Sequence, residues 1–152
     1  MNNKITKEQM AKLSPELRKA LREYEQSPFR YYNLNPNGNR TGDCVIRAIG
    51  AAMGKTWEEV LKDLYEYSLK HKLFLGNHEL YGIYLQDNGW TKHQIPYKRN
   101  GNMYCLKEWI KKHNKPALVI IDGNHLTYVI NQKVYDIWDC TEHMVHEYWT
   151  YN

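Results

Sequence analysis

Residues 117–138 read ALVIIDGNHLTYVINQKVYDIW, and this stretch decides the fold class of the chain. Its first five residues are all apolar and follow Pro116, which is typical of a buried strand after a chain break. Two more extended segments follow at 125–130 and 133–138, and 144–151 is a candidate fourth. The sequence therefore predicts a meandering antiparallel sheet in its C-terminal third.

The chain before this stretch has the apolar periodicity of helices. An irregular loop at 33–43, dense in Gly and Asn, leads into an apolar helical pattern that begins near Cys44 and ends at Gly54. We expect further helices from the capping box at Thr56, over 79–86, and from Asn102 to about residue 112. Helices first and a sheet last predict an α+β fold, with the N-terminal helices packed on a C-terminal antiparallel sheet.

The first thirty residues differ in character from the rest. Residues 4–25 are charged and have a pattern that predicts helix, with a second helix start at Ser14 and Pro15. Leu13, Leu17 and Leu21 recur at helical spacing and form one narrow apolar stripe, which could dock on the main domain or bind a partner; we favour docking. The predicted organisation is a helical arm at 1–30 and one globular domain at 31–152.

The composition narrows the class of protein. With 152 residues, 42% of them hydrophobic, the chain can bury a sizeable core as one domain. A formal net charge of +4 does not call for nucleic acid. Three widely spaced cysteines do not suggest a disulfide framework, and neither a secretory signal nor a membrane span is apparent. We expect a cytoplasmic protein without a membrane partner; the oligomeric state is not indicated.

Cys44 is the strongest candidate for a nucleophile. It lies where the polar loop changes into a helix, and unpaired N–H groups at a helix start stabilise a thiolate. Its own N–H could donate to an oxyanion that develops beside the thiol. A buried structural cysteine is the alternative, but Gly42 and Asp43 place the thiol beside a polar loop.

His125 and Asp136 are the candidate base and its orienting carboxylate. If Asn131 and Gln132 form a two-residue turn, Thr127 lies opposite Asp136, and His125 becomes the diagonal neighbour of Asp136 on one face. A three-residue turn would reverse the parity and bring Asp139 to that face, so Asp139 is the alternate. A thiol, a base and an orienting carboxylate together suit covalent acyl transfer.

These segments resemble papain-like cysteine peptidases. Asp136-Ile137-Trp138 is similar to the Asn-Ser-Trp segment of papain-type enzymes, whose Trp shields the His–Asn hydrogen bond from water. Gly42-Asp43-Cys44 resembles the nucleophile segment of OTU-type deubiquitinating peptidases, and small bacterial and phage members of the superfamily carry similar segments. The resemblance implies a papain-like fold, catalysis by Cys44, His125 and Asp136, and a supporting role for Trp138.

The resemblance has two departures, both in the loop before Cys44. Papain-type enzymes carry an oxyanion-hole Gln six positions before the Cys, where this chain has Gly38. OTU-type enzymes carry an Asp three positions before it, where this chain has Thr41. The amides of Asn39 or Asn37 could serve as the oxyanion donor instead.

The sequence thus leaves two main functions open. The first is a cysteine hydrolase that cleaves a peptide, isopeptide or side-chain amide bond of a protein or peptide substrate. The second is an inactive papain-like scaffold, for example a phage or mobile-element protein that binds a host factor. Cys140, His143 and His146 have metal-like spacing, but a structural role is favoured, so we expect no metal or other cofactor.

Overall fold

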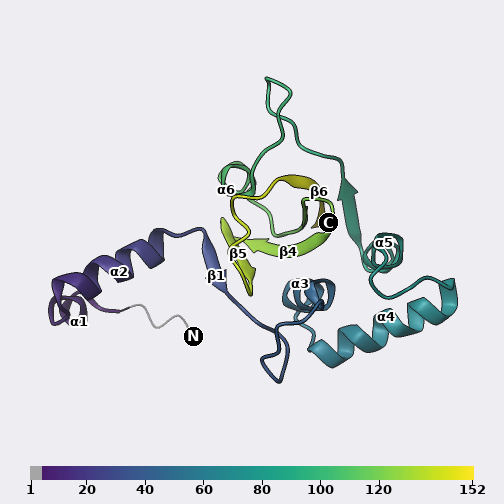
Figure 1. Ribbon diagram of the computed structural model, residues 1–152, viewed down its shortest axis with the longest axis horizontal. Helices are drawn as coiled ribbons and strands as arrows, with labels where there is room; N and C mark the ends of the chain where they lie inside the picture. The colour runs from purple at the N-terminus through teal and green to yellow at the C-terminus, as the bar shows by residue number, and fades with distance from the viewer. Residues whose placement is uncertain (1–4) are drawn as a thin grey trace.

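The computed structural model of the chain describes residues 5–152, and Figure 1 shows its arrangement. The described part combines helices with a single six-stranded sheet in an α+β arrangement. The helices are α1 (Lys7–Ala11), α2 (Pro15–Gln26), α3 (Cys44–Met53), α4 (Trp57–His71), α5 (His78–Asp87) and α6 (Leu106–Trp109). The strands are β1 (Phe29–Tyr31), β2 (Trp90–His93), β3 (Ala117–Ile121), β4 (His125–Ile130), β5 (Lys133–Asp136) and β6 (Val145–Tyr151).

The six strands form one sheet in the order β1-β5-β4-β3-β6-β2. The meander from β3 to β5 is antiparallel as predicted, and β6 also pairs with β3. The expectation of a purely antiparallel, C-terminal sheet is wrong, because β1 pairs with β5 in parallel and β2 comes from the middle of the chain. Both are short edge strands of three and four residues, too short to give a periodic sequence pattern.

The sheet is covered on both faces, which explains the all-apolar sequence of β3. Leu118 and Ile120 pack in a cluster with residues of α3, α4 and α5. Ala117, Val119 and Ile121 point to the other face and pack with residues of α6. All five residues of β3 are buried, because alternate side chains of a strand enter opposite layers.

The central helix α3 packs closely against the loop that precedes it. The helix ends at Gly54 in the left-handed conformation, as its sequence predicts. Inside the helix, a Cβ added at Gly50 would collide with the side chain of Leu34 and lie 2.9 Å from the carbonyl oxygen of Lys55. The loop at 33–43 is therefore held against the helix whose first residue is Cys44.

Replacing Gly50 with alanine tests this close packing. Overpacking typically costs about 1–3 kcal/mol, and the better helix propensity of alanine offsets up to about 1 kcal/mol. We expect a net loss of about 1–2 kcal/mol in the free energy of unfolding, measured by urea denaturation. Gly42→Ala is the matched control, because its added Cβ meets open space. Equal stability of the two variants would contradict the close approach.

The N-terminal arm does not dock. The structure confirms the helix start at Ser14, but no residue of α1 or α2 is buried, and Leu17 is 48% exposed. Figure 1 shows both helices extending away from the sheet and from α3. Within residues 5–152, the arm is anchored at the end of α2, through hydrogen bonds from Lys133 and Arg30 to backbone carbonyls at 24–27. The prediction of a docked stripe is therefore wrong, and the boundary placed at residue 30 falls within β1.

The helix predicted from Asn102 is also largely wrong. Residues 103 and 105 form isolated bridges with Tyr97 and Met144, so the chain is extended there and α6 comprises only four residues. Pairing with a distant segment overrides the local helical signal. Among residues 5–152, no helix has the length and apolar character required to cross a bilayer.

Candidate active site

Cys44 is the first residue of α3, as predicted, and its side chain is partly buried. Thr41 accepts a hydrogen bond from the backbone N–H of Asp43, and Asp43 then accepts the first helical hydrogen bond from Arg47. Because the first N–H groups of a helix have no acceptor within the helix, they stabilise negative charge at the thiol. Cys44 also lines a small pocket with Tyr32, Leu126, Tyr135 and Asp136.

The hairpin between β4 and β5 has the predicted register. Asn131 and Gln132 both have positive φ, and Ile130 pairs with Lys133, which is the geometry of a two-residue turn. His125 and Asp136 consequently meet, with Nε2 of His125 2.6 Å from Oδ2 of Asp136. A carboxylate can only accept, so Nε2 carries the proton and Nδ1 is left for Cys44.

The electrostatics favour a proton on His125 and a thiolate on Cys44. Burial by itself lowers the pKa of His125, but hydrogen bonds with Asp136, Cys140 and Cys44 raise it to about 11. Burial by itself raises the pKa of Cys44, but hydrogen bonds with His125 and the backbone of Leu126 lower it below its usual value. Opposite shifts of this kind are typical of a thiolate–imidazolium pair.

Arg47 links this pair to the loop before Cys44. Its guanidinium is buried, forms an ion pair with Asp43, and lies 3.8 Å from Oδ1 of Asp136. Asp43 also accepts hydrogen bonds from Asn35 (3.1 Å) and from the indole N–H of Trp57 (2.9 Å). One buried guanidinium thus lies beside two buried carboxylates and connects the end of β5 to the start of α3, and the protonated His125 supplies the second positive charge at Asp136.

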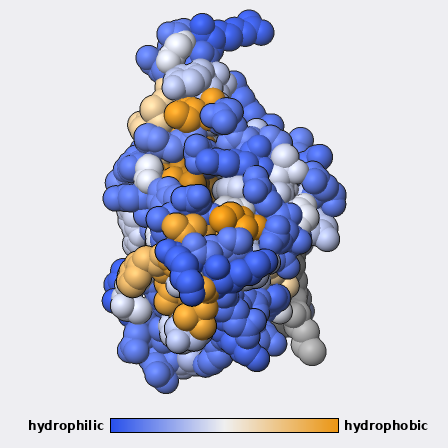
Figure 2. Space-filling model, turned by 90° about the vertical axis from the view of Figure 1, so that its right-hand side faces the viewer, coloured by the Kyte–Doolittle hydropathy of each residue, from blue (hydrophilic) through white to orange (hydrophobic). Residues whose placement is uncertain are grey.

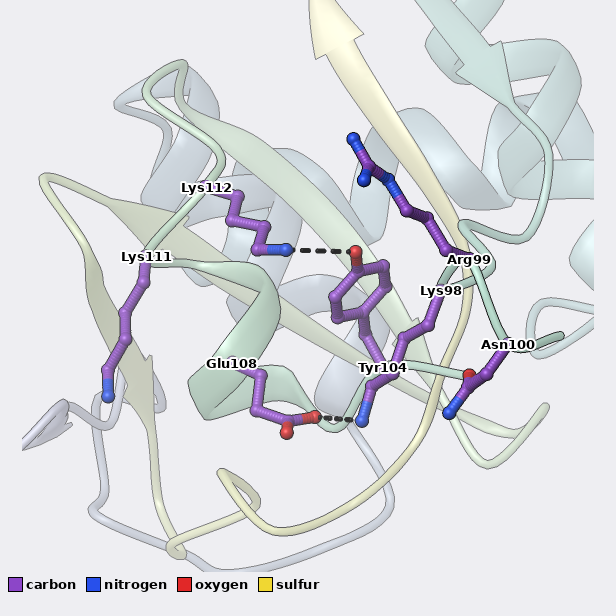
Figure 3. Close-up of a pocket in the computed structure, with 7 residues that line it drawn as sticks. All are labelled: Lys98, Arg99, Asn100, Tyr104, Glu108, Lys111 and Lys112. Carbon is purple, nitrogen blue, oxygen red and sulfur yellow. Dashed lines mark hydrogen bonds and ion pairs between the residues drawn. The ribbon is translucent and has the colours of Figure 1, made fainter. Parts of the chain in front are cut away.

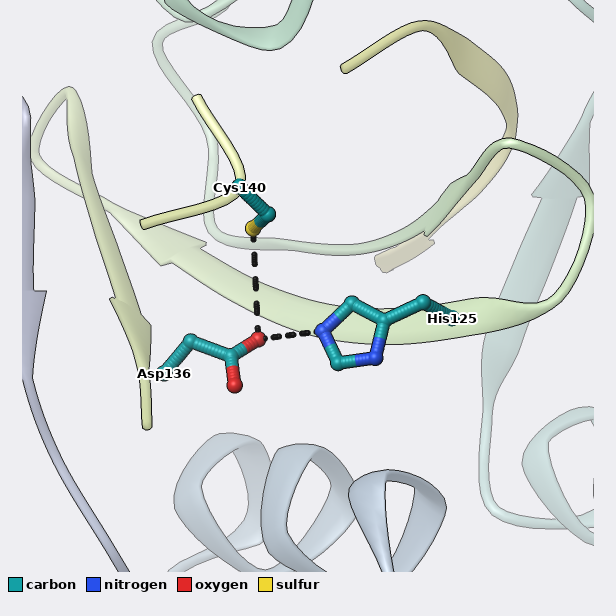
Figure 4. A group of neighbouring side chains, drawn as sticks. All are labelled: His125, Asp136 and Cys140. Carbon is teal, nitrogen blue, oxygen red and sulfur yellow. Dashed lines mark hydrogen bonds and ion pairs between the residues drawn. The ribbon is translucent and has the colours of Figure 1, made fainter. Parts of the chain in front are cut away.

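Cys140 contacts the carboxylate of Asp136 as well. Its side chain is fully buried, and Sγ lies 4.0 Å from Oδ2 of Asp136, as Figure 4 shows. Burial raises the pKa of Cys140, so its thiol stays protonated and can donate weakly to Asp136. Two cysteines flank one histidine, but only Cys44 has the lowered pKa that a nucleophile requires.

His125, Asp136 and Cys140 also form a possible donor set for a metal, with ligand atoms within 4.8 Å of one another. Two ligands on a tetrahedral zinc ion, each at about 2.0–2.1 Å, lie roughly 3.3 Å apart. The 2.6 Å between Nε2 and Oδ2 is shorter, so His125 and Asp136 would have to separate to hold an ion. His143 and His146 are not part of this group; His143 instead bonds Asp122.

Trp138 covers the imidazole. The centroid of its ring lies 5.0 Å from that of His125. The indole also contacts His143 edge-on, with ring centroids 4.9 Å apart. His143 is held in turn by Asp122. The indole therefore lies beside the imidazole that bonds Asp136, and its shielding role stays a prediction.

Asn37, Asn39 and Asp139 lie apart from this group. Asn37 and Asn39 are exposed on the loop, and neither lines the pocket beside Cys44. The buried amide of that loop is Asn35, whose Oδ1 accepts the backbone N–H groups of both residues. Asp139 is exposed and accepts hydrogen bonds from Thr141, so of these two carboxylates it is Asp136 that contacts His125.

With this geometry established, the chain was compared with known proteins. No family model, curated protein or solved structure matches it. Function must therefore be inferred from the site, because a fold class alone does not determine chemistry.

The sequence did not predict Asn35 or the ion-pair role of Arg47, and it pointed to Cys140 only as a candidate metal ligand. Arg47 had a detectable signal, since it is the single charge in an apolar helix and lies one turn after Cys44. Asn35 lies in a loop with three other asparagines, spaced by single residues, so nothing distinguished it. Cys140 follows β5 in an irregular segment, where periodicity gives no orientation.

Proposed function

We propose that the protein is a papain-like cysteine hydrolase that cleaves a peptide, isopeptide or side-chain amide bond. The observation that carries the proposal is the 2.6 Å contact of His125 with Asp136, beside a thiol, Cys44, that lies near enough for the thiol and the imidazole to shift each other's pKa. The three residues come from three separate elements, α3, β4 and β5. The pKa of the thiol is lowered and that of the imidazole is raised, so the proton resides on His125 and the thiolate is the nucleophile. Strongly shifted pKa values in a thiol and an imidazole that lie side by side are typical of functional sites.

The residues suit a two-step acyl transfer. The Cys44 thiolate attacks the amide carbonyl carbon, and the backbone N–H of Cys44 donates to the developing oxyanion. The imidazolium of His125 then gives its proton to the departing amine, and the C–N bond breaks to leave a thioester. His125, now neutral, removes a proton from water, which attacks the thioester and releases the acid and Cys44. Asp136 holds the imidazole orientation throughout.

The surroundings of the thiol support an extended substrate. Tyr32 and Tyr135 meet edge-on at 6.3 Å beside the pocket that contains Cys44. Tyr31, at the end of edge strand β1, is 59% exposed. Aromatic side chains next to an open strand edge suit a protein or peptide chain. The three unpaired cysteines support a reducing, cytoplasmic setting.

One observation favours the alternative of an inactive scaffold that binds a host factor. Neither of the expected amide donors, Asn37 or Asn39, lies among the residues that surround Cys44 in its small pocket, so no side-chain oxyanion donor is identified there. Loss of one oxyanion donor typically lowers kcat by about 10²–10³-fold. The fold could therefore persist as a binding protein with little turnover.

A covalent probe distinguishes the two functions. The chain would be incubated with a peptide vinyl sulfone, a ubiquitin-like probe and a muropeptide probe, and adducts would be located by mass spectrometry. We expect one adduct, on Cys44, which is lost in Cys44→Ser and kept in Cys105→Ser, because Cys105 is buried with a raised pKa. A folded wild-type chain that no probe labels would support the scaffold instead.

A further inference from the structure

A basic pocket surrounds Tyr104, separate from the residues of the candidate active site. Its cavity of about 720 Å³ is open to solvent and lies between the loop at 98–104 and α6 with the residues that follow it (Figure 3). The charged side chains that line it are Lys98, Arg99, Glu108, Lys111 and Lys112. We call this the Tyr104 pocket.

The Tyr104 pocket concentrates the positive charge of the chain. Four cations against one carboxylate give it a formal charge of +3, compared with +4 for the whole sequence. The carboxylate of Glu108 already forms an ion pair with Lys98, whose ammonium lies 2.7 Å away, and it accepts a hydrogen bond from the backbone N–H of Cys105. Across residues 5–152, Arg99 and Lys111 form no ion pair, so their charges face solvent without compensation.

The centre of the pocket is prearranged for anions. The ammonium of Lys112 donates to the hydroxyl of Tyr104 (3.2 Å), and the ammonium groups of Lys112 and Lys98 lie 5.0 and 5.6 Å from its ring centroid. These contacts hold two flexible lysines in place before a ligand binds, which reduces the entropy cost of binding. They also occupy the aromatic ring, so a nucleic acid base has little free surface on which to stack.

We propose that the Tyr104 pocket binds a carboxylate-rich segment of a partner protein. Carboxylates match the uncompensated charges of Arg99 and Lys111, and Arg binds them in a bidentate manner. The volume falls in the range of about 300–1,000 Å³ that holds a drug-sized ligand, which suits a few residues of a peptide.

The proposal does not depend on the chemistry of Cys44, and its test separates the two. Binding of a fluorescein-labelled ten-residue Glu-rich peptide to the full chain would be measured by anisotropy, in wild type and in Cys44→Ser. A peptide with Gln in place of Glu and a single-stranded oligodeoxynucleotide of equal charge serve as comparison probes. We expect the Glu peptide alone to bind, equally in both proteins.

Charge-reversal variants then locate the binding site. Lys111→Glu and Arg99→Glu are each expected to weaken binding of the Glu peptide about tenfold, because a favourable contact becomes repulsive. Lys62→Glu, an equal charge change at an exposed position of α4, is expected to change it less than about twofold. Absence of binding, an equal loss in Lys62→Glu, or tighter binding of the oligonucleotide would each overturn the proposal.

Discussion

Replacing His125 with alanine is expected to slow alkylation of Cys44 by iodoacetamide about 100-fold at pH 5.5. An ordinary cysteine, with a pKa near 8.5, is only about 0.1% thiolate at this pH, and the thiolate is the reactive form. In the wild type, His125 lowers the pKa of Cys44 and takes up its proton, so more thiolate persists. The expected ratio is below the full gain in thiolate, because a thiolate of lower pKa is intrinsically less nucleophilic.

The pH dependence of the alkylation rate should differ between the wild type and His125→Ala. Without His125, the alkylation rate should fall about tenfold for each unit below pH 8, as for a free thiol. With His125, the fall should begin at a lower pH, because the folded pKa of Cys44 is shifted downward. Cys105→Ser is the control and should match the wild type. Identical profiles for wild type and His125→Ala would remove the ion pair from the mechanism, and with it the proposed hydrolase.

Replacing Arg47 with methionine is expected to cost about 3–5 kcal/mol of the free energy of unfolding, the usual penalty for removing one partner of a buried ion pair. The variant leaves the buried carboxylates of Asp43 and Asp136 without their shared cation. For a chain of this size, each kcal/mol corresponds to about 2–4 °C, so the midpoint of thermal unfolding should fall by roughly 10 °C. Differential scanning fluorimetry measures this shift.

A second variant separates lost charge compensation from lost packing. Adding Asp43→Asn to Arg47→Met removes one stranded charge, so the double variant should be more stable than Arg47→Met alone. Arg22→Met, on the exposed arm, removes the same guanidinium without a buried partner and should change stability by no more than about 0.5 kcal/mol. A loss below 1 kcal/mol in Arg47→Met would show that the buried network contributes little.

The contact between His125 and Asp136 could be predicted because it depends on local rules. A two-residue turn fixes the pairing of the strands it joins, and the alternation of a strand then fixes which side chains share a face. The same holds for the start of α3 at Cys44 and its end at Gly54. Each of these inferences uses residues close together in the sequence.

The compensation around Asp136 could not be predicted in this way. Arg47 and Cys140 reach it from α3 and from the segment after β5, and their approach depends on how the helix packs on the sheet. Edge strands β1 and β2 were missed for a related reason, because pairing with β5 and β6 rather than their own sequence makes them strands. The arm shows the opposite case, an amphipathic helix whose apolar stripe finds no surface on its own domain.

The sequence by itself thus determined the α+β class, the position of Cys44 at a helix start, and the hairpin that joins His125 to Asp136. Only the tertiary structure decided that α3 brings Cys44 near His125, that Arg47 lies between two buried carboxylates, and that Asn35 rather than Asn37 or Asn39 organises the loop. The physical reason is the range of the interactions. Turns, caps and strand alternation act over a few residues, whereas burial and charge compensation depend on segments that meet only in the folded chain.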